Sequence, residues 1–165
     1  MKKITQLTFH CSLNYGAVLQ TYALGKVLVG LGHSVKILDF RPYWIDPVWS
    51  GIRPRTWLVQ AKFYYFWKKY LPPFTACIRD SSKLAAQCAD ADAVIVGSDQ
   101  VWNPEITRSF ADEYFLKSVP KPVSRISYAA SFGISPDEWI KKFNVKRRVA
   151  LLKKFNAVFM VEYFS

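Results

Sequence analysis

The sequence contains few of the residues on which disulfide scaffolds and metal sites depend. It has only three cysteines, Cys11, Cys77 and Cys88, and no pair of them has CxxC spacing. This pattern argues against a disulfide framework or a zinc site, and we expect each cysteine to be a small buried residue in a reducing compartment. The only histidines are His10 and His33, without a carboxylate–histidine cluster, so no metal is expected. His10 should not pair with Cys11, because neighbours on a strand point to opposite sides.

Long apolar segments and acidic residues are also scarce. No run reaches the roughly 18 apolar residues of a membrane span, and segment 1–9 is too short and too polar for a signal peptide. We therefore expect a cytoplasmic protein that is able to contact the inner face of a membrane. Lys and Arg number 23 against 12 Asp and Glu, and the net charge of +11 attracts anions such as nucleic acid, lipid headgroups or phosphorylated substrates. With 51% hydrophobic residues, positions 1–165 should form a single folded domain.

Strand and helix patterns alternate along the chain. Residues 4–9 and 34–40 are predicted as strands and 17–31 as the helix between them, with Gly30 and Gly32 at its end. Such a βαβ unit makes its two strands parallel. Further strands are predicted at 93–96, 124–130 and 157–161. Helical segments are predicted at 57–70, at 81–88 with Ser81 or Ser82 as cap, at 106–116, and from Ser135 to about Lys154 with a break near Asn144. The predicted fold class is α/β, a doubly wound, mostly parallel Rossmann-like sheet.

Polar segments follow three of the predicted strands, where such sheets bind their ligands. The first contains Asn14, Tyr15 and Gly16 and runs directly into a helix, whose N-terminal N–H groups favour an anion. It lacks the GxGxxG dinucleotide motif, and Asn and Gly also occur in plain turns. The third segment, 127–133, contains Tyr128 and Ser131 among small residues that let either a ligand or a helix approach closely.

The second segment, 97–104, has the densest set of hydrogen-bonding side chains: Ser98, Asp99, Gln100 and Asn103. Asp99 is the only candidate catalytic residue. It would orient a hydroxyl or act as a base, or it would simply accept backbone N–H bonds in a capped turn. Trp102 would stack on a sugar face or form a wall of the cleft.

The three segments together resemble the polysaccharide pyruvyl transferase family, in the stretches 14–24, 96–103 and 127–133. The resemblance implies transfer of a pyruvyl group from phosphoenolpyruvate, the donor substrate, to a saccharide or lipid-linked glycan, forming a ketal in surface polysaccharide biosynthesis without a further cofactor. It implies the N-terminal domain of a two-domain, GT-B-like transferase. The substrate cleft would be lined by Asn14, Tyr15, Gly16, Ser98, Asp99, Gln100, Trp102, Asn103, Tyr128 and Ser131.

Two departures from the family pattern stand out. Family members continue into a second Rossmann-like domain, where the catalytic His and the basic donor-binding residues are expected, whereas this sequence stops at Ser165. The segment 159–165 also lacks the Arg of a Ser-Val-Arg-Glu-like stretch. We therefore expect a truncated or frameshifted N-terminal half of such an enzyme. The sequence does not indicate whether this half is active by itself. The alternatives are a sugar-nucleotide glycosyltransferase of similar architecture and a non-catalytic basic module that binds a membrane or another protein.

Residues 41–80 form an aromatic and basic excursion from the α/β pattern, with Trp44, Trp49, Trp57 and Trp67 among Lys, Arg and Pro residues. Such a segment would lie on an anionic membrane surface or pack on the core or the second domain. Its composition also suits single-stranded nucleic acid. No nucleic-acid motif accompanies it, so nucleic acid is not an expected partner, and no oligomeric state is predicted.

Overall fold

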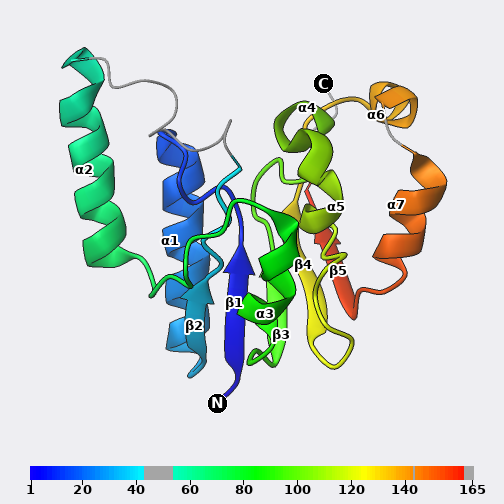
Figure 1. The fold of residues 1–165 in the computed structure, drawn as a ribbon, viewed down its shortest axis with the longest axis horizontal. Helices are drawn as coiled ribbons and strands as arrows, with labels where there is room; N and C mark the ends of the chain where they lie inside the picture. Colours follow the sequence, from blue (N-terminus) through cyan, green and yellow to red (C-terminus); the bar gives the residue numbers. More distant parts are fainter. Residues whose placement is uncertain (43–53, 143, 162–165) are drawn as a thin grey trace.

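The computed structural model describes residues 1–42, 54–142 and 144–161. Five strands form one sheet: β1 (Lys3–Leu7), β2 (Ser34–Ile37), β3 (Ala93–Val96), β4 (Ser124–Ala130) and β5 (Ala157–Met160) (Figure 1). Their order is β2-β1-β3-β4-β5, and every neighbouring pair is parallel. The prediction of an α/β Rossmann-like sheet is confirmed.

Helices connect the strands in the predicted order. The longer ones are α1 (Tyr15–Gly30), α2 (Pro54–Tyr70), α6 (Pro136–Lys142) and α7 (Val145–Leu152). Shorter turns are η1 (Ser81–Lys83), α3 (Leu84–Cys88), α4 (Pro104–Thr107), η2 (Arg108–Phe110) and α5 (Ala111–Tyr114). The predicted break near Asn144 is present, since the Asn144 side chain caps α7 by accepting from the Arg147 N–H at 3.1 Å. The predicted cap at Ser81 or Ser82 is wrong: Asp80 caps η1 and accepts from the Ser82 N–H.

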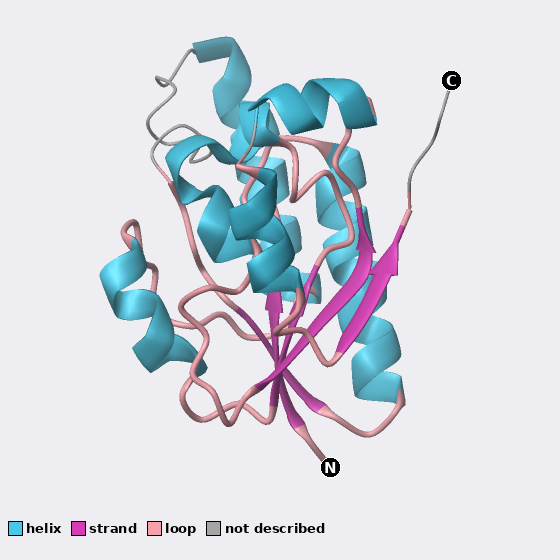
Figure 2. Ribbon diagram, turned by 90° about the vertical axis from the view of Figure 1, so that its right-hand side faces the viewer, coloured by secondary structure: helices cyan, strands magenta, loops and turns pink. Residues whose placement is uncertain are grey.

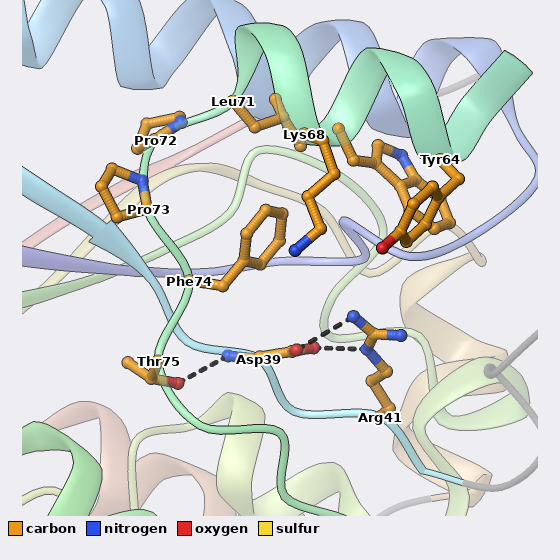
Figure 3. A pocket seen from close by; sticks show the side chains of 10 residues that line it. Asp39, Arg41, Tyr64, Lys68, Leu71, Pro72, Pro73, Phe74 and Thr75 are labelled. Atoms are coloured by element: carbon orange, nitrogen blue, oxygen red, sulfur yellow. Dashed lines mark hydrogen bonds and ion pairs between the residues drawn. The ribbon is translucent and has the colours of Figure 1, made fainter.

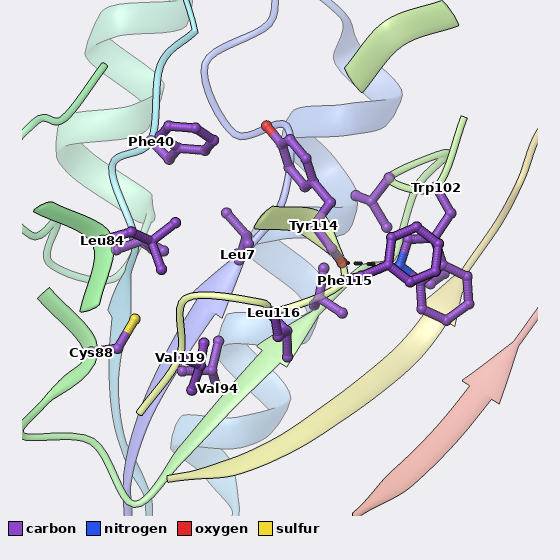
Figure 4. Close-up of a cluster of buried hydrophobic side chains, with 14 of the residues drawn as sticks. Leu7, Phe40, Leu84, Cys88, Val94, Trp102, Tyr114, Phe115, Leu116 and Val119 are labelled. Carbon is purple, nitrogen blue, oxygen red and sulfur yellow. Dashed lines mark hydrogen bonds between the residues drawn. The ribbon is translucent and has the colours of Figure 1, made fainter. Parts of the chain in front are cut away.

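Helices cover both faces of the sheet, which is why the central strand β3 is apolar on both sides. On one face Leu7, Val94 and Val96 pack with residues of α3 and α5 (Figure 4). On the other face Ile4, Val35 and Ile95 pack against Leu24 and Leu28 of α1. Figure 2 shows helices on both sides of the twisted sheet, so the predicted doubly wound arrangement is confirmed.

The excursion is described only in part. Trp44, Trp49 and Arg53 lie outside the described residues. From Pro54 onward, α2 lies at the outer edge of the molecule beside α1 (Figure 1), where Phe63, Trp67 and Leu71 pack with Val18 and Ile37. Over the described ranges, no helix is both long enough and apolar enough to cross a membrane.

Candidate functional site

The candidate site lies where the carboxyl ends of β1 and β3 meet. These strands are neighbours, paired from Ile4 with Ala93 to Leu7 with Val96. In the order 2-1-3-4-5 the chain leaves β1 toward one side of the sheet and β3 toward the other, and doubly wound proteins bind ligands at this switch point. The first and second predicted segments are the loops that follow these two strands. The sheet therefore brings them together.

Three side chains join the two loops in a closed hydrogen-bond network. Thr8, just beyond β1, donates from Oγ1 to the Ser98 carbonyl at 3.3 Å and accepts from Gln20 Nε2 at 2.8 Å. Ser98 Oγ donates to Gln20 Oε1 at 3.0 Å. Thr8 is fully buried. The network holds the loop after β3 against the second turn of α1 and fixes the direction of the residues that follow Ser98.

Thr8 and Gln20 are site residues that were not predicted from the sequence. Gln20 stands within the stretch that resembles the pyruvyl transferases, four residues after Gly16. Residues four apart lie on the same face of a helix, so its amide is one turn above the helix start and near the strand end. The spacing of four residues between Gly16 and Gln20 could have indicated from the sequence that Gln20 lies at the site.

Asp99 is held tightly by its backbone, and its carboxyl group is half-buried. Its carbonyl accepts from the Val101 N–H at 2.7 Å and from the Ser131 N–H at 2.9 Å, and its Oδ1 accepts from the Gln100 N–H at 2.7 Å. Burial raises the pKa of Asp99 above its ordinary value, and the bond from Gln100 offsets part of that rise. No cation of the described residues pairs with it. A carboxyl group of this kind is suited to exchange a proton with a substrate hydroxyl.

Side-chain contacts join the second and third predicted segments, and they involve Gln100, Asn103, Ser131 and Gly133. Gln100 Oε1 accepts from Asn103 Nδ2 at 3.0 Å, while Asn103 Oδ1 caps α4 through the Glu105 N–H. A Cβ on Gly133 would lie 2.3 Å from Gln100 Oε1, and the φ of Gly133 is +64°. Ser131 Oγ accepts from the Gly133 N–H at 3.0 Å. Gln100 thus lies directly over Gly133, which only a glycine allows.

Asn14, Tyr15 and Gly16 form the start of α1. Asn14 Oδ1 accepts from the N–H groups of Gly16 at 2.8 Å and Ala17 at 3.3 Å, so two donors of the helix start are already used. The Tyr15 side chain is 69% exposed, and its ring lies 4.8 Å from that of Phe63 in α2. In this structure Asn14 is therefore a helix cap, and Tyr15 faces solvent beside α2.

Trp102 does not occupy the predicted position on a cleft wall. It is fully buried, its ring stacks on Phe115 at 5.0 Å, and its Nε1 donates to the Tyr114 carbonyl at 3.0 Å (Figure 4). Because no part of the side chain reaches solvent, stacking on a sugar is excluded in this structure. Tyr128, in contrast, is 51% exposed on β4, and its backbone carbonyl faces Gly97.

A second polar cluster, not expected from the sequence, lies at the end of β2. His10 Nε2 is 2.9 Å from Asp39 Oδ1, and its Nδ1 is 3.2 Å from the Thr8 carbonyl. Arg41 holds both Asp39 oxygens through Nε and Nη2 (Figure 3). Burial raises the pKa of Asp39, but the hydrogen bonds from His10 and Arg41 outweigh it, and the pKa lies below its ordinary value. Asp39 and Arg41 are two residues apart, and residues with this spacing on a strand point to the same face of the sheet. That spacing could have indicated from the sequence that the two side chains meet.

No group of three or more potential metal ligands occurs within residues 1–42, 54–142 and 144–161. The polar atoms at the candidate site are hydroxyls, amides and one carboxyl group. The chemistry of this set is suited to hydrogen-bonding a hydroxylated molecule, and Asp99 adds a group that can exchange a proton.

Comparisons with known proteins show the family and the fold of the chain. The family model described as polysaccharide pyruvyl transferase matches residues 14–160, which include all three polar segments. Among solved structures, AtPrR2 in its apo form is similar with a TM-score of 0.50 and 11% sequence identity over 93% of this chain. That likeness concerns the fold alone, and this chain spans 46% of the length of that one. No curated protein matches the sequence significantly. The extent of the family match shows that the chain belongs to the polysaccharide pyruvyl transferase family.

Proposed function

We propose that the chain is the Rossmann-like N-terminal half of an enzyme that transfers a pyruvyl group from phosphoenolpyruvate to a saccharide in surface polysaccharide biosynthesis. The family match supports the class of reaction. The observation that carries the assignment of the site is Asp99, a half-buried carboxyl group with a raised pKa at the β1/β3 switch point.

The reaction needs groups that hold and activate hydroxyls. One acceptor hydroxyl adds to C2 of the enolpyruvyl group as C3 gains a proton. A second hydroxyl then replaces phosphate at C2 and closes the ketal. Asp99 would take the proton of an attacking hydroxyl, and its raised pKa suits that task. Gln100, whose side chain lies over Gly133, would orient the sugar.

The experiment uses the product of the longest reading frame that contains this chain. It is incubated with phosphoenolpyruvate and a panel of monosaccharide, oligosaccharide and lipid-linked acceptors, and phosphate release and the ketal methyl signal are measured together. Release of phosphate with ketal formation, dependent on the acceptor, is the expected result. Turnover of sugar nucleotides instead would assign a glycosyltransferase, and the absence of both activities would leave a binding module. Either outcome contradicts the proposal.

We further propose that α2 contacts an anionic membrane surface, which would bring the enzyme to lipid-linked acceptors at the inner face. Its side away from the sheet combines the exposed aromatic residues Trp57 and Tyr65 with Lys62 and Lys69. The helix sequence contains no acidic residue. Aromatic rings at the headgroup level and cations facing anionic lipid are the features of an interfacial helix.

Liposome flotation tests this contact. The protein should float with vesicles containing anionic lipid and stay behind with neutral vesicles. Trp57→Ala and Lys69→Gln should each reduce recovery several-fold, because each residue anchors the same face. Phe159→Ala, which removes an equally exposed aromatic ring on β5, serves as the control and should float like the parent. Equal recovery with both kinds of vesicle would contradict the membrane contact.

A further inference from the structure

A cavity of about 560 Å³ lies between the end of β2 and helix α2. Asp39 and Arg41 form one side, α2 forms another, and the segment 71–75 closes a third (Figure 3). Its volume is within the range of sites for small molecules, about 300–1,000 Å³. The cavity is next to the switch point, because β2 pairs with β1. It is nevertheless a separate space from the loops that hold Ser98 and Asp99.

The only acid that lines the cavity is already neutralised. Asp39 is held by Arg41 at both oxygens and by His10 at 2.9 Å, and its backbone N–H donates to Thr75 Oγ1 at 3.0 Å. The remaining charged lining residue is Lys68, which is exposed and belongs to α2. The lining therefore favours a negatively charged guest.

Hydrogen-bond donors of α2 face the same space. Figure 3 shows the Lys68 ammonium and the Tyr64 hydroxyl pointing from α2 toward Arg41 and Asp39. Trp67, only 7% exposed, also lines the cavity with part of its ring. The donors of α2 that reach this space are therefore those of Lys68 and Tyr64.

Flat apolar surfaces complete the lining. Tyr64, Trp67 and Phe74 offer three aromatic rings, and Pro72 and Pro73 lie beside them. Phe74 is fixed by its ring contact with His10 at 5.5 Å. Aromatic faces accept the apolar face of a sugar ring, while the hydroxyl of Tyr64 can bind its polar edge. Cations and hydrogen-bond donors surround these aromatic side chains, so the lining suits a sugar ring that carries an anionic substituent.

We propose that this cavity binds an anionic sugar unit, a pyranose that carries a phosphate or a carboxylate group. The anion lies between Lys68 and Arg41, the ring lies on the aromatic residues, and a sugar oxygen accepts from the Tyr64 hydroxyl. This binding does not depend on the pyruvyl transfer proposed above, because none of these residues belongs to the switch-point loops. A ligand held here would extend toward the switch point, since β2 and β3 are separated only by β1, roughly 10 Å in all.

Calorimetric titration of the full chain tests the proposal, with glucose 1-phosphate, glucuronate, uncharged glucose and inorganic phosphate as probes. Glucose 1-phosphate or glucuronate should bind at least about tenfold more tightly than glucose and than phosphate, since ring and charge are both recognised. The tighter of the two identifies the anion. Binding of phosphate as strong as that of the sugar phosphate would show general anion attraction and overturn the proposal, as would no binding of either charged sugar.

Matched variants on α2 separate the cavity from the helix surface. Lys68→Gln should weaken binding of the charged sugar about tenfold, and Tyr64→Phe should weaken it several-fold. The control variants Lys69→Gln and Tyr65→Phe change the neighbouring residues, which lie outside the cavity, and should bind the sugar as the parent does. Circular dichroism confirms that each variant keeps the fold. Equal losses from Lys68→Gln and Lys69→Gln, or an unchanged affinity of both Lys68→Gln and Tyr64→Phe, would contradict the assignment.

Discussion

Replacing Gly97 by Ala should destabilise the fold strongly, because two constraints meet at this residue. Gly97 ends β3 with a φ of +106°, and an added Cβ would lie 2.3 Å from the Tyr128 carbonyl oxygen and 3.1 Å from the Ala130 nitrogen. Relaxed C···O contacts are about 3.3–3.6 Å, so β3 and β4 would have to separate by about 1 Å. Backbone strain and overpacking each cost about 1–3 kcal/mol, which gives an expected loss of about 2–6 kcal/mol.

Urea denaturation followed by circular dichroism measures this loss as a change in the free energy of unfolding. The matched control is Gly30→Ala at the end of α1, where an added Cβ meets nothing within 4 Å. That change should be neutral or stabilising by up to about 1 kcal/mol. If Gly97→Ala unfolds within 1 kcal/mol of the parent, about the size of the control effect, the close approach of β3 and β4 described here is wrong.

Three further predictions concern the site and its surroundings. The pKa of Asp99 is raised in the folded state, so ionising its carboxyl group lowers the free energy of unfolding. Asp99→Asn should therefore gain stability relative to the parent as the pH rises from about 4 to about 7. A stability difference that does not change with pH would contradict this. Thr8→Val should cost about 1–3 kcal/mol in urea denaturation, because Ser98 and Gln20 each lose a partner, and a loss below about 0.5 kcal/mol would count against the network. Burial, assisted by Asp90, raises the pKa of Cys88 to about 12, so iodoacetamide at about pH 8 should label exposed Cys77 and spare Cys88, as read by mass spectrometry; equal labelling would refute it.

Much of the fold followed from periodicity, because most elements obey it locally. The strands at 93–96 and 124–130 were predicted with the bounds that the structure has. The region 106–116 was harder: its helical turns are divided into α4, η2 and α5, with Arg108 at a φ of +48° and Leu116 at +55°. Such breaks depend on tertiary packing around Tyr114 and Phe115, which a single sequence does not display.

The candidate site was only partly predictable for a related reason. The loops after β1 and β3 were found because strand ends and polar clusters are visible in sequence. Trp102 was misplaced because a Trp in a polar segment gives no sign of whether its ring faces the loop or the core, and here Phe115 and Tyr114 determine that direction. His10 and Asp39 meet across 29 positions, a contact that arises only once β1 and β2 pair.

In the proposed reaction, Asp99 at the β1/β3 switch point exchanges the proton of the acceptor hydroxyl, and kcat for pyruvyl transfer by Asp99→Asn measures this role. The comparison is Asp90→Asn, which removes an exposed carboxylate paired with Lys36 on the amino-terminal side of β3. Asp99→Asn should stay folded and lose about 100-fold or more in kcat, while Asp90→Asn should keep the parent value. Parent-like turnover by folded Asp99→Asn would contradict it.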